Sequence, residues 1–527
     1  MKVPAPTWCP DCRFKLRAVW RNEMSLYNRT CIVTGKSIIS VYNPKSPYKV
    51  VSLDFYNGDQ WTPFSFGREY DFSKTFFEQL DSLLKDVYKK ALFPISSVGQ
   101  NIDSDYVNFA GGCKNSYFCF NTAYAENVMY SRGSTNIKDS IDVYYNDHIE
   151  NCYECVNVYK SNGVFWGQNS TSCIDCIFIE NCNNCQDCFG CVNLHNKSFC
   201  FFNEQLSKEE YYQRISEYVG SKNGMNIVAT LFKSHALKYP KRATQNRNVI
   251  NCSGDYIFES NNCKNCFETG HSENSKYFFG TRNTKDSYGG TGGIGVTESI
   301  ENMTANHSNR MIGTVACENS HDIEYSFVLN NCSNFIGCDG LKNSQYCILN
   351  KQYTKEEYEK IREHIVNELI SLDWYGLIIP PSLSPFAYNE TIAQDNMSLT
   401  KEEASLLGFR WEDSLQVTKG KETIQLNQIP DSIKDVLVSI TSEILSCSNC
   451  VRNYKILPQE FVFYKRLNIP IPEICFYCRH SNRIKRRGFL TFYNRNCANC
   501  SKEITTNYAP DRPEIVYCKS CYQKEVF

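Results

Sequence analysis

Four CxxC pairs follow one another near the C-terminal end of the sequence. They are Cys447 and Cys450, Cys475 and Cys478, Cys497 and Cys500, and Cys518 and Cys521. A CxxC turn directs two thiolates at one point, and two such turns complete the tetrahedral sulfur shell in which Zn²⁺ is commonly held. The eight cysteines therefore predict two zinc ions, with sequential pairing across loops of 24 and 17 residues favoured over a cross-braced arrangement. Because sulfur fills all four positions, we expect structural rather than catalytic zinc.

The segment that joins these pairs occurs a second time near the N-terminus. Cys12 to Cys31 and Cys478 to Cys497 have the same length, and a shift of 466 residues superimposes them without a gap. The shift aligns three arginines of each copy, namely Arg13, Arg17 and Arg21 with Arg479, Arg483 and Arg487. The first copy has Thr34 where the second has Cys500. We interpret it as a degenerate zinc ribbon, whose candidate ligands for a third zinc ion are Cys9, Cys12 and Cys31.

Basic residues are concentrated between the second and third CxxC pairs. Six of them occur there with no acidic residue among them: Arg479, Arg483, Lys485, Arg486, Arg487 and Arg495. In a helix, the arginines spaced four residues apart would share one face. Such a face, with Phe489, Phe492 and Tyr493 nearby, could hold phosphates and stack bases, which would make nucleic acid or a nucleoprotein a partner. The alternative is a solvated or protein-contacting face, with the aromatic residues packed on the zinc knuckle.

Length, charge and cysteine content restrict the class of protein. A chain of 527 residues can hold several domains, and its net charge of −1 gives no overall attraction to nucleic acid or to acidic membranes. No apolar run is long enough to span a bilayer, and the first residues lack an apolar stretch of signal-peptide length. With 29 cysteines, this pattern favours metal binding in a reducing compartment. We therefore expect a cytoplasmic protein without a membrane partner.

The middle of the chain repeats every twelve residues. Repeats, or rungs, begin near Ser116, Val128, Ser140, Cys152 and Val164, and again at Cys173, Cys185 and Lys197; adding 147 to each number gives a second array. Each rung is a short aromatic and β-branched stretch that cannot bury a face alone, so the rungs must stack. The predicted fold is mostly β, a duplicated parallel β-helix (β-solenoid) with helical caps, flanked by zinc ribbons. We favour a coil of two rungs over a coil of one, because the many aromatic residues need a wide interior.

Side chains within the rungs have expected positions as well. The Asn or Asp that precedes each rung predicts a ladder at a turn, where such residues tolerate the left-handed conformation. The eighteen cysteines of this region would face inward as small hydrophobic residues. Metal binding by "CNNCQDCFGC" (Cys182, Cys185, Cys188 and Cys191) is a rival interpretation, and disulfides are another.

Capping boxes mark helices around the two arrays. Ser207 with Glu210, Thr354 with Glu357 and Thr400 with Glu403 each predict a helix start, and an amphipathic helix from about Ser73 to Leu92 should cover the first rung. The expected organisation is a degenerate N-terminal ribbon (1–62), an amphipathic helix or cap (63–98), a first array (99–205), a helical cap and linker (206–245), a second array (246–352), a second helical cap and linker (353–440), and tandem zinc ribbons (441–527).

Catalytic motifs are sparse, so no catalytic residue is assigned. Residues 290–295 read "GTGGIG" but precede no long helix, which indicates a glycine-rich turn, and there is no Walker lysine, HExxH or GxSxG. Asp139 and Asp286, like Glu126 and Glu273, recur at equivalent rung positions, as a turn ladder requires. The leading hypothesis is a zinc-binding, non-enzymatic intracellular scaffold. A scaffold that binds protein without nucleic acid, and a carbohydrate-active β-helix enzyme, are the alternatives.

Several motifs also carry a resemblance to known families. "CSNCVRNYKILPQEFVFYKRLNIPIPEICFYCR" resembles a probable zinc-ribbon family with the pattern CxxC…CxxCR, and "CANCSKEITTNYAPDRPEIVYCKSC" resembles a CxxC-x17-CxxC zinc-ribbon family; both support sequential pairing. The whole chain resembles one uncharacterised family of cysteine-rich zinc-ribbon proteins of candidate phyla radiation bacteria. That resemblance rests on "FGREYDFSKTFFEQ", "SPFAYNETIAQD" and "RPEIVYC" among other stretches. It implies zinc ribbons but no activity.

Overall fold

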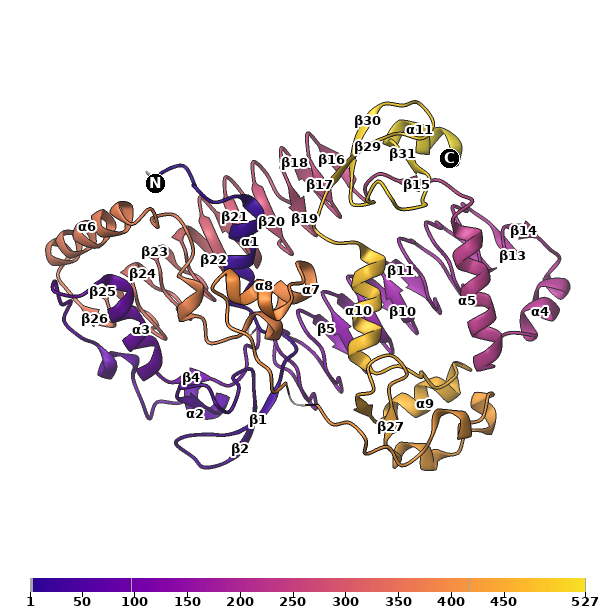
Figure 1. Cartoon of the computed structure of the whole chain (residues 1–527), viewed down its shortest axis with the longest axis horizontal. Coiled ribbons are helices and arrows are strands. Elements are labelled where there is room, and N and C mark those ends of the chain that lie inside the picture. The colour runs from indigo at the N-terminus through magenta and orange to yellow at the C-terminus, as the bar shows by residue number, and fades with distance from the viewer. Residues whose placement is uncertain (1–2, 96, 416, 527) are drawn as a thin grey trace. The chain divides into compact units, whose positions relative to one another are not determined.

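The chain divides into two compact units, each built from two separate stretches. The structure, a computed structural model, describes residues 3–95, 97–415 and 417–526. Unit 1 contains Met1–Phe93 and Thr244–Asp413, and unit 2 contains Pro94–Ala243 and Ser414–Phe527. Each unit combines one of the two arrays with one copy of the cysteine and arginine segment (Figure 1). Unit 1 thus holds the second array with the N-terminal copy, and unit 2 the first array with the C-terminal copy.

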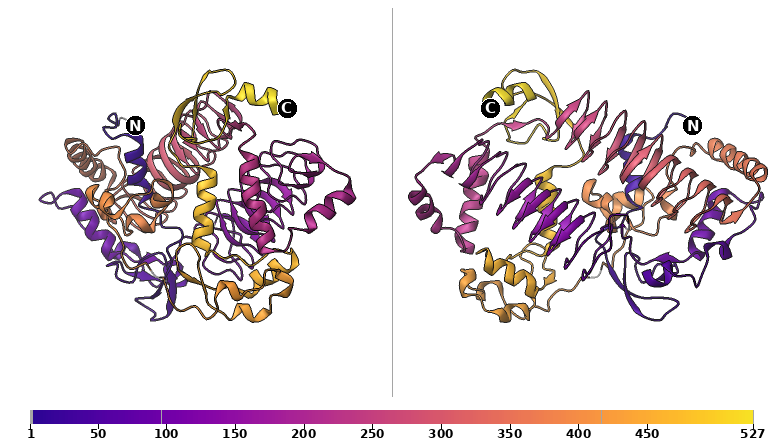
Figure 2. Two further views of the ribbon diagram at one scale, coloured as in Figure 1. Left: turned by 45° about the vertical axis from the view of Figure 1, so that its right-hand side comes forward. Right: turned by 180° about the vertical axis from the view of Figure 1, so that it is seen from behind.

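Each array forms a ladder of short parallel strands. We call residues 102–201 the first ladder and residues 247–348 the second ladder. In the first ladder Met129 pairs with Ile141, and Ile141 pairs with Tyr153. In the second ladder Phe279 pairs with Thr291, and Thr291 pairs with Met303. Successive partners are twelve residues apart, so the register of strand pairing matches the spacing in the sequence. Figure 2 shows the short strands of each ladder lying side by side.

Most ladder strands are only four residues long. In the first ladder they are β5 (Ala123–Glu126), β6 (Met129–Arg132), β7 (Thr135–Lys138), β8 (Ile141–Tyr144), β9 (Asp147–Glu150), β10 (Tyr153–Val156), β11 (Tyr159–Asn162), β12 (Gln186–Phe189) and β13 (Ser198–Phe201). The second ladder contains β16 (Arg247–Ile250), β17 (Gly254–Asp255), β18 (Phe258–Asn261), β19 (Cys266–Phe267), β20 (Lys276–Phe279), β21 (Tyr288–Thr297), β22 (Ile300–Ile312), β23 (His321–Glu324), β24 (Ser333–Ile336) and β25 (Gln345–Ile348). Of these, β17 and β19 have two residues, β21 has ten and β22 has thirteen. Residues 290–295 lie inside β21, so they form a strand rather than the predicted glycine-rich turn.

A left-handed residue recurs at about every third position of both ladders, including positions inside strands, such as Tyr130 in β6. Asn115, Phe118 and Asn121 have φ of 47°, 57° and 49°, and the pattern continues along both ladders. Asn and Asp occupy many of these positions, where their side chains bond one another between neighbouring rungs. The Nδ2 of Asn127 donates to Asp139 Oδ1 at 2.9 Å, and the equivalent bond from Asn274 to Asp286 is also 2.9 Å. The predicted ladder of Asn and Asp side chains is therefore confirmed.

The predicted fold class is wrong. The chain contains 24% helix and 28% strand, its strands fall into many separate sheets, and no sheet of the described residues closes. The largest sheet of the described residues has nine strands and belongs mostly to the second ladder, whereas the first ladder is divided among smaller sheets. The coil of two rungs is also wrong, because each rung pairs directly with the next. Aromatic residues such as Tyr130, Trp166 and Phe178 stand outside the ladder and pack against helices, so no wide interior is required.

Cysteines fill the inside of the ladders, as the sequence predicted. Twenty-four of the 29 free cysteines are buried, and those of the ladders pack with Val, Ile and Ala side chains. Their thiols bond backbone carbonyls: Cys155 Sγ lies 3.5 Å from the oxygen of Tyr153 and 3.2 Å from that of Val164. Among the described residues Cys182, Cys185, Cys188 and Cys191 are not part of a metal-binding group. These cysteines act as small core residues that also satisfy their own S–H groups.

Helices begin where the capping boxes predicted. α4 (Lys208–Ser216), α6 (Lys355–Ser371) and α8 (Lys401–Leu406) start directly after Ser207, Thr354 and Thr400. The amphipathic helix is shorter than expected, because α3 (Phe76–Asp86) starts after a capping box at Thr75 and ends before Val87. Its residue Phe76 packs on Tyr325 of the second ladder, so the helix does not cover the first rung of the first array as predicted. Among the described residues, no helix is both long and apolar enough to cross a membrane.

Candidate metal centres and the arginine helix

The first group of four cysteines joins a β-knuckle to the start of a helix. Cys447 and Cys450 lie in the turn between β27 (Leu445–Ser446) and β28 (Asn453–Tyr454). Cys475 is the N-cap of α10 (Phe476–Arg487), and Cys478 lies in its first turn. The Sγ atoms of Cys447 and Cys478 are 3.8 Å apart, and those of Cys450 and Cys475 are 3.7 Å apart.

The second group repeats this construction after α10. Cys497 and Cys500 lie in the turn between β29 (Tyr493–Asn496) and β30 (Glu503–Thr506). Cys518 and Cys521 lie at the junction of β31 (Val516–Tyr517) with α11 (Lys519–Val526). The Sγ atoms of Cys500 and Cys518 are 3.8 Å apart. The sequential pairing of the four CxxC turns is therefore confirmed.

The spacing of the sulfur atoms fits a metal ion at the centre of each group. Within each group, all four Sγ atoms lie within 4.8 Å of one another. A tetrahedral Zn²⁺ with Zn–S bonds of about 2.3 Å would place its sulfur ligands about 3.8 Å apart. The observed separations of 3.7 and 3.8 Å match this value. Both groups can thus hold a metal ion of zinc's size and coordination preference.

Hydrogen bonds to the sulfur atoms favour the thiolates that bind metal. Burial acts against ionisation of Cys447, but N–H groups of Cys475, Cys450 and Asn449 outweigh it and lower the pKa of the thiol to about 7. The Ser520 hydroxyl and the N–H of Cys521 lower the pKa of Cys518 to about 6. Cys447 and Cys518 are therefore favoured in the thiolate form that coordinates metal, whereas burial raises the pKa of Cys475 and Cys478, and hydrogen bonds with Cys500 and Cys518 raise the pKa of Cys521 to about 12.

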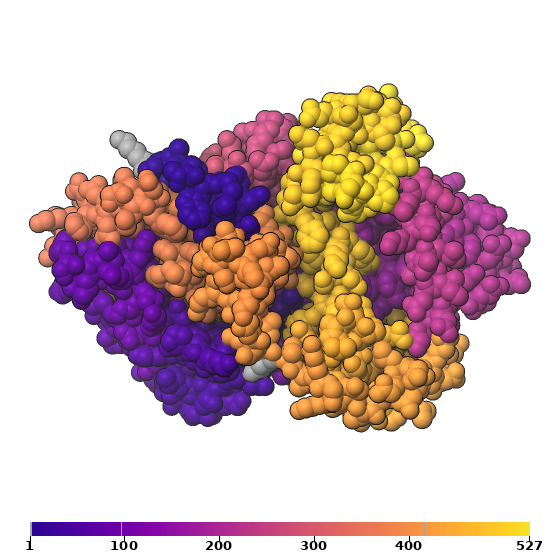
Figure 3. Space-filling model, in the orientation of Figure 1, coloured from indigo at the N-terminus to yellow at the C-terminus, as the bar shows by residue number. Residues whose placement is uncertain are grey.

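The helix between the two groups is fixed on the first ladder by buried arginines. Arg479 donates to Asp142 at 2.6 Å, and Arg483 pairs with both Asp142 (2.9 Å) and Glu154 (2.6 Å). The side chains of these two arginines are 3% and 1% exposed. Arg487 donates to the hydroxyl of Tyr144 at 2.7 Å. Figure 3 shows residues 458–526, orange to yellow, covering this side of the first ladder. We call α10 the arginine helix.

The N-terminal copy makes the same kind of contact with the second ladder. α1 (Pro10–Ala18) lies against β21 and β22, where Arg13 donates to Glu301 at 2.5 Å and Arg17 pairs with the other oxygen of that carboxylate. Arg21 donates to Thr304 Oγ1 at 2.7 Å. Glu301 is related to Glu154 by the 147-residue shift between the ladders, and Arg17 to Arg483 by the 466-residue shift. Helix and ladder have therefore kept one ion pair in both copies.

The six residues predicted to contact nucleic acid mostly bind their own chain. Beyond Arg479, Arg483 and Arg487, Arg486 donates to Glu154 Oε2 at 2.9 Å. Arg495 donates to the backbone oxygens of Ala509 and Glu514, both at 3.2 Å. Only Lys485 is exposed without a recorded ion pair among the described residues. The buried arginines cannot reach a phosphate without leaving their carboxylates, so the alternative of a protein-contacting face describes this helix better.

Cys9, Cys12 and Cys31 do not form a metal-binding group. The described residues contain no third group of at least three close ligands. The 466-residue shift explains why, since it aligns Cys9 and Cys12 with the first C-terminal group but Cys31 with the second. The three cysteines therefore correspond to parts of two different sites. The prediction of a shared third site was based on their order in the sequence and overlooked this division.

Packing replaces metal around Cys31. The knuckle keeps its shape, because the N–H of Cys31 donates to Lys36 at 2.8 Å just as that of Cys497 donates to Lys502 at 2.8 Å. Burial opposes ionisation of Cys31, but hydrogen bonds from Thr34 and Ser52 outweigh it and lower the pKa to about 7. An apolar cluster surrounds the sulfur and includes Val51, Tyr56, Phe55, Ile38, Trp61 and Tyr88. Phe55 aligns with Cys521, so an apolar ring packs in this cluster where the second copy has a candidate metal ligand.

Sequence reasoning missed the carboxylates that receive the arginines. Glu154 and Glu301 occupy equivalent places in the two arrays, and this coincidence, beside the repeated arginines, was a detectable signal of pairing. Asp142 has no such counterpart, because the equivalent position is Gly289. α5 (Lys222–Ala236) was missed as well, although Ser221 caps it and apolar residues recur along one side.

Comparisons with known proteins add no relative to this picture. No protein-family model matches the chain, and no curated protein matches it. The resemblance to a family of cysteine-rich zinc-ribbon proteins stays a prediction.

Proposed function

We propose that the chain is a zinc-binding, non-enzymatic scaffold protein in which two zinc ions hold the arginine helix on the first ladder. The observation that carries the proposal is the pair of four-cysteine groups, with Sγ separations of 3.7 and 3.8 Å, at the two ends of one helix. Cys475 begins that helix and Cys497 follows it closely, so each metal ion would fix one end.

The position of the groups supports a structural role for the metal. Each group offers four sulfur ligands, which leaves no coordination position for a substrate or a reactive water. Metal bound there would stabilise the fold, as in small zinc modules whose folding depends on the ion. The ion pairs of Arg479 and Arg483 would form only when the helix is correctly placed. The zinc ions and the buried ion pairs would therefore both stabilise the contact between the arginine helix and the first ladder.

Fewer residues bear on the question of which partner the scaffold binds. Nucleic acid or a nucleoprotein would have to be bound by Lys485 and the partly exposed Arg486, because the other arginines have partners in the chain. A protein partner without nucleic acid fits the buried arginines better. Fluorescence anisotropy with a labelled single-stranded oligonucleotide distinguishes the two: salt-sensitive binding that Lys485→Gln weakens would favour nucleic acid, and no binding at low salt would favour a protein partner.

Zinc content tests the proposal directly. We expect two zinc ions per chain by mass spectrometry of metals after gel filtration. Cys447→Ser with Cys450→Ser should remove one ion, and Cys518→Ser with Cys521→Ser should remove the other. Cys252→Ser, a half-buried cysteine outside both groups, is the matched control and should keep two. A ratio below one in the unchanged protein, or the same ratio in every variant, would contradict the proposal.

A further inference from the structure

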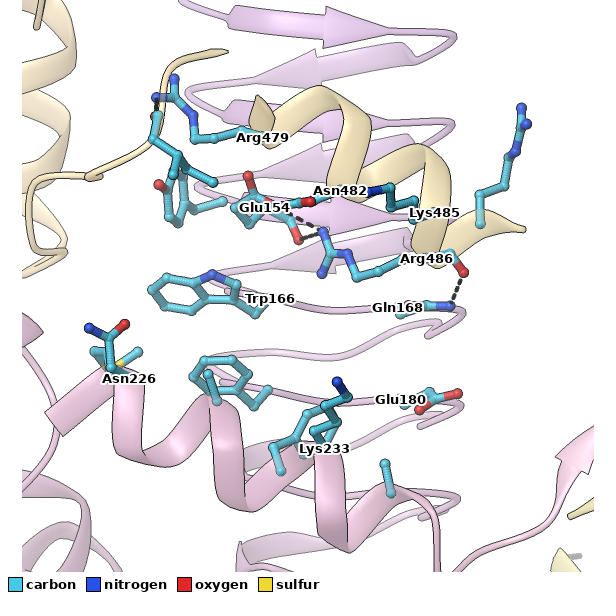
Figure 4. A pocket seen from close by; sticks show the side chains of 18 of the residues that line it. Glu154, Trp166, Gln168, Glu180, Asn226, Lys233, Arg479, Asn482, Lys485 and Arg486 are labelled. Carbon is cyan, nitrogen blue, oxygen red and sulfur yellow. Dashed lines mark hydrogen bonds and ion pairs between the residues drawn. The ribbon is translucent and has the colours of Figure 1, made fainter. Parts of the chain in front are cut away.

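A cavity of about 950 Å³ lies in unit 2 between the arginine helix and α5. The outer side of the first ladder forms one wall with Trp166 and Phe178, and the loop around Tyr508 closes another side. Its size is within the range of small-molecule sites, which combine apolar walls with a few polar groups. Figure 4 shows Trp166 beside the cavity, with Lys233 on α5 and Arg486 on α10 at opposite sides.

The charges around the cavity do not balance. Its lining includes eight basic residues, Lys222, Lys233, Lys241, Arg479, Lys485, Arg486, Arg487 and Arg512, but only four carboxylates, Glu154, Glu180, Glu473 and Glu514. Arg479 is already neutralised by the buried Asp142 outside the lining, but the other seven basic residues still outnumber the four carboxylates. The chain as a whole has a net charge of −1, so this excess of positive charge is local. A concave surface lined by one sign of charge raises the local concentration of ligands of the opposite charge.

Every carboxylate of the lining already has a cation of its own. Glu180 pairs with Lys241 at 2.7 Å, and Glu473 pairs with Lys222 at 3.0 Å. Glu154 and Glu514 are likewise paired with arginines. Lys233 and Lys485 have no ion pair within the described part of the chain. They come from the two facing helices, so a ligand between the helices would meet an ammonium group from each.

The apolar wall determines what kind of anion the cavity suits. Trp166 stacks on Phe178 with ring centroids 4.9 Å apart, and the ring of Tyr153 meets it at 87°. Trp166 therefore offers its edge rather than a free face, which is unlike the stacking platforms that bind single-stranded nucleic acid. Phe232 of α5 adds a half-buried ring. A ligand with a compact apolar or aromatic group could pack here while its anionic end meets the lysines.

We propose that this cavity binds a small organic phosphate, whose phosphate is held by Lys233 and Lys485 and whose apolar group packs on Trp166 and Phe232. Phosphate is the fitting anion because it carries up to two negative charges and several acceptor oxygens for two ammonium groups and Arg486. The site is separate from both cysteine groups, although Lys485 and Arg486 are also the residues that a nucleic acid would have to contact.

Isothermal titration calorimetry of the zinc-loaded full chain tests the site with phenyl phosphate and adenosine 5′-monophosphate as probes. We expect at least one of them to bind at one site per chain, and at least tenfold more tightly than inorganic phosphate or phenol. Lys233→Gln with Lys485→Gln should weaken that binding at least tenfold. Lys238→Gln, an exposed lysine just beyond α5 that does not line the cavity, should leave it unchanged.

A second variant separates the two halves of the site. Phe232→Leu should weaken the organic phosphate but leave the affinity for inorganic phosphate unchanged. The proposal is overturned if neither probe binds, if the double lysine variant binds as tightly as the unchanged protein, or if Lys238→Gln has an equal effect. Circular dichroism and zinc content of each variant would show that the fold is intact, so loss of binding cannot be mistaken for loss of the metal sites.

Discussion

Replacing Arg483 with methionine tests whether buried ion pairs fix the arginine helix. The guanidinium is 1% exposed and pairs with Asp142 at 2.9 Å and with Glu154 at 2.6 Å. Removing one member of a buried ion pair costs about 3–5 kcal/mol, because a charge is left in the interior. Asp142 would keep Arg479 and Glu154 would keep Arg486, so we expect the lower end, about 3 kcal/mol.

That loss should appear in both global and local measurements. For domains of about 150–250 residues, 1 kcal/mol shifts the melting temperature by about 2–4 °C, so Arg483→Met should lower it by about 6–12 °C. Hydrogen exchange of peptides from 476–487 should quicken more than that of peptides from the second ladder. Lys485→Met makes the same chemical change on the exposed side of the helix and should cost less than about 0.5 kcal/mol.

The effect of pH provides an independent check on the same variant. Burial raises the pKa of Glu154 even when Arg483 is present. Without Arg483 that pKa should rise further, because a neighbouring positive charge is lost. A carboxylate whose folded pKa lies above its unfolded value destabilises the fold at higher pH, and the penalty disappears once it is protonated. The deficit of Arg483→Met should therefore be larger at pH 8 than at pH 5.5. Equal melting temperatures for Arg483→Met and Lys485→Met would refute this account of the helix.

Three further predictions follow from the other sites. Glu301→Gln removes the shared partner of Arg13 and Arg17, so urea denaturation should show a loss of about 3 kcal/mol, whereas a loss below 1 kcal/mol would contradict the buried pair. Lowering the pH from 7 to 4 should release both zinc ions, because protons compete for the thiolates; a zinc-sensitive dye that reports full retention at pH 4 would argue against cysteine ligands. In the folded, zinc-loaded protein a thiol reagent should react quickly with no more than three cysteines, Cys9, Cys12 and Cys252, and rapid labelling of many more would show that the ladder interior is open.

Features defined by local chemistry were readable from the sequence. The CxxC turns identified both cysteine groups, because two residues between the ligands already bring two sulfur atoms together. The capping boxes at Ser207, Thr354 and Thr400 located helix starts, since the bonds that define them lie within four residues. Inward-facing cysteines could be predicted as well, because small apolar side chains that recur at regular positions can stack on one another inside a repeat.

Features set by long-range contacts or by unusual backbone were not readable. Asn and Asp indicated left-handed positions, but the same positions are also held by Tyr130, Trp166 and Glu154, which rarely adopt positive φ. The period of three was therefore hidden, and with it the short strands and the exterior placement of aromatic rings. The sequence left open whether Arg483 faces phosphates, solvent or protein, because its partner Glu154 is 329 residues away in the sequence. Helical spacing shows which residues share a face but not what covers that face.

The distance along the chain between each ladder and its helix has a consequence for synthesis. The first ladder is made early, but Arg483 follows Glu154 by 329 residues. At about 5–20 residues per second, the ribosome would need roughly 16–66 s to supply the covering helix. During that time the side of the ladder around Asp142 and Glu154 has no native cover. The only comparable helix already made is α1, whose partner Glu301 has not yet been made. The newly made chain therefore passes through a stage in which the first ladder and α1 are present but α10, the helix that covers the first ladder, is not. The two ladders differ at Gly289, which leaves no counterpart of Asp142 in the second ladder. This is one difference by which the two ladders could distinguish their helices.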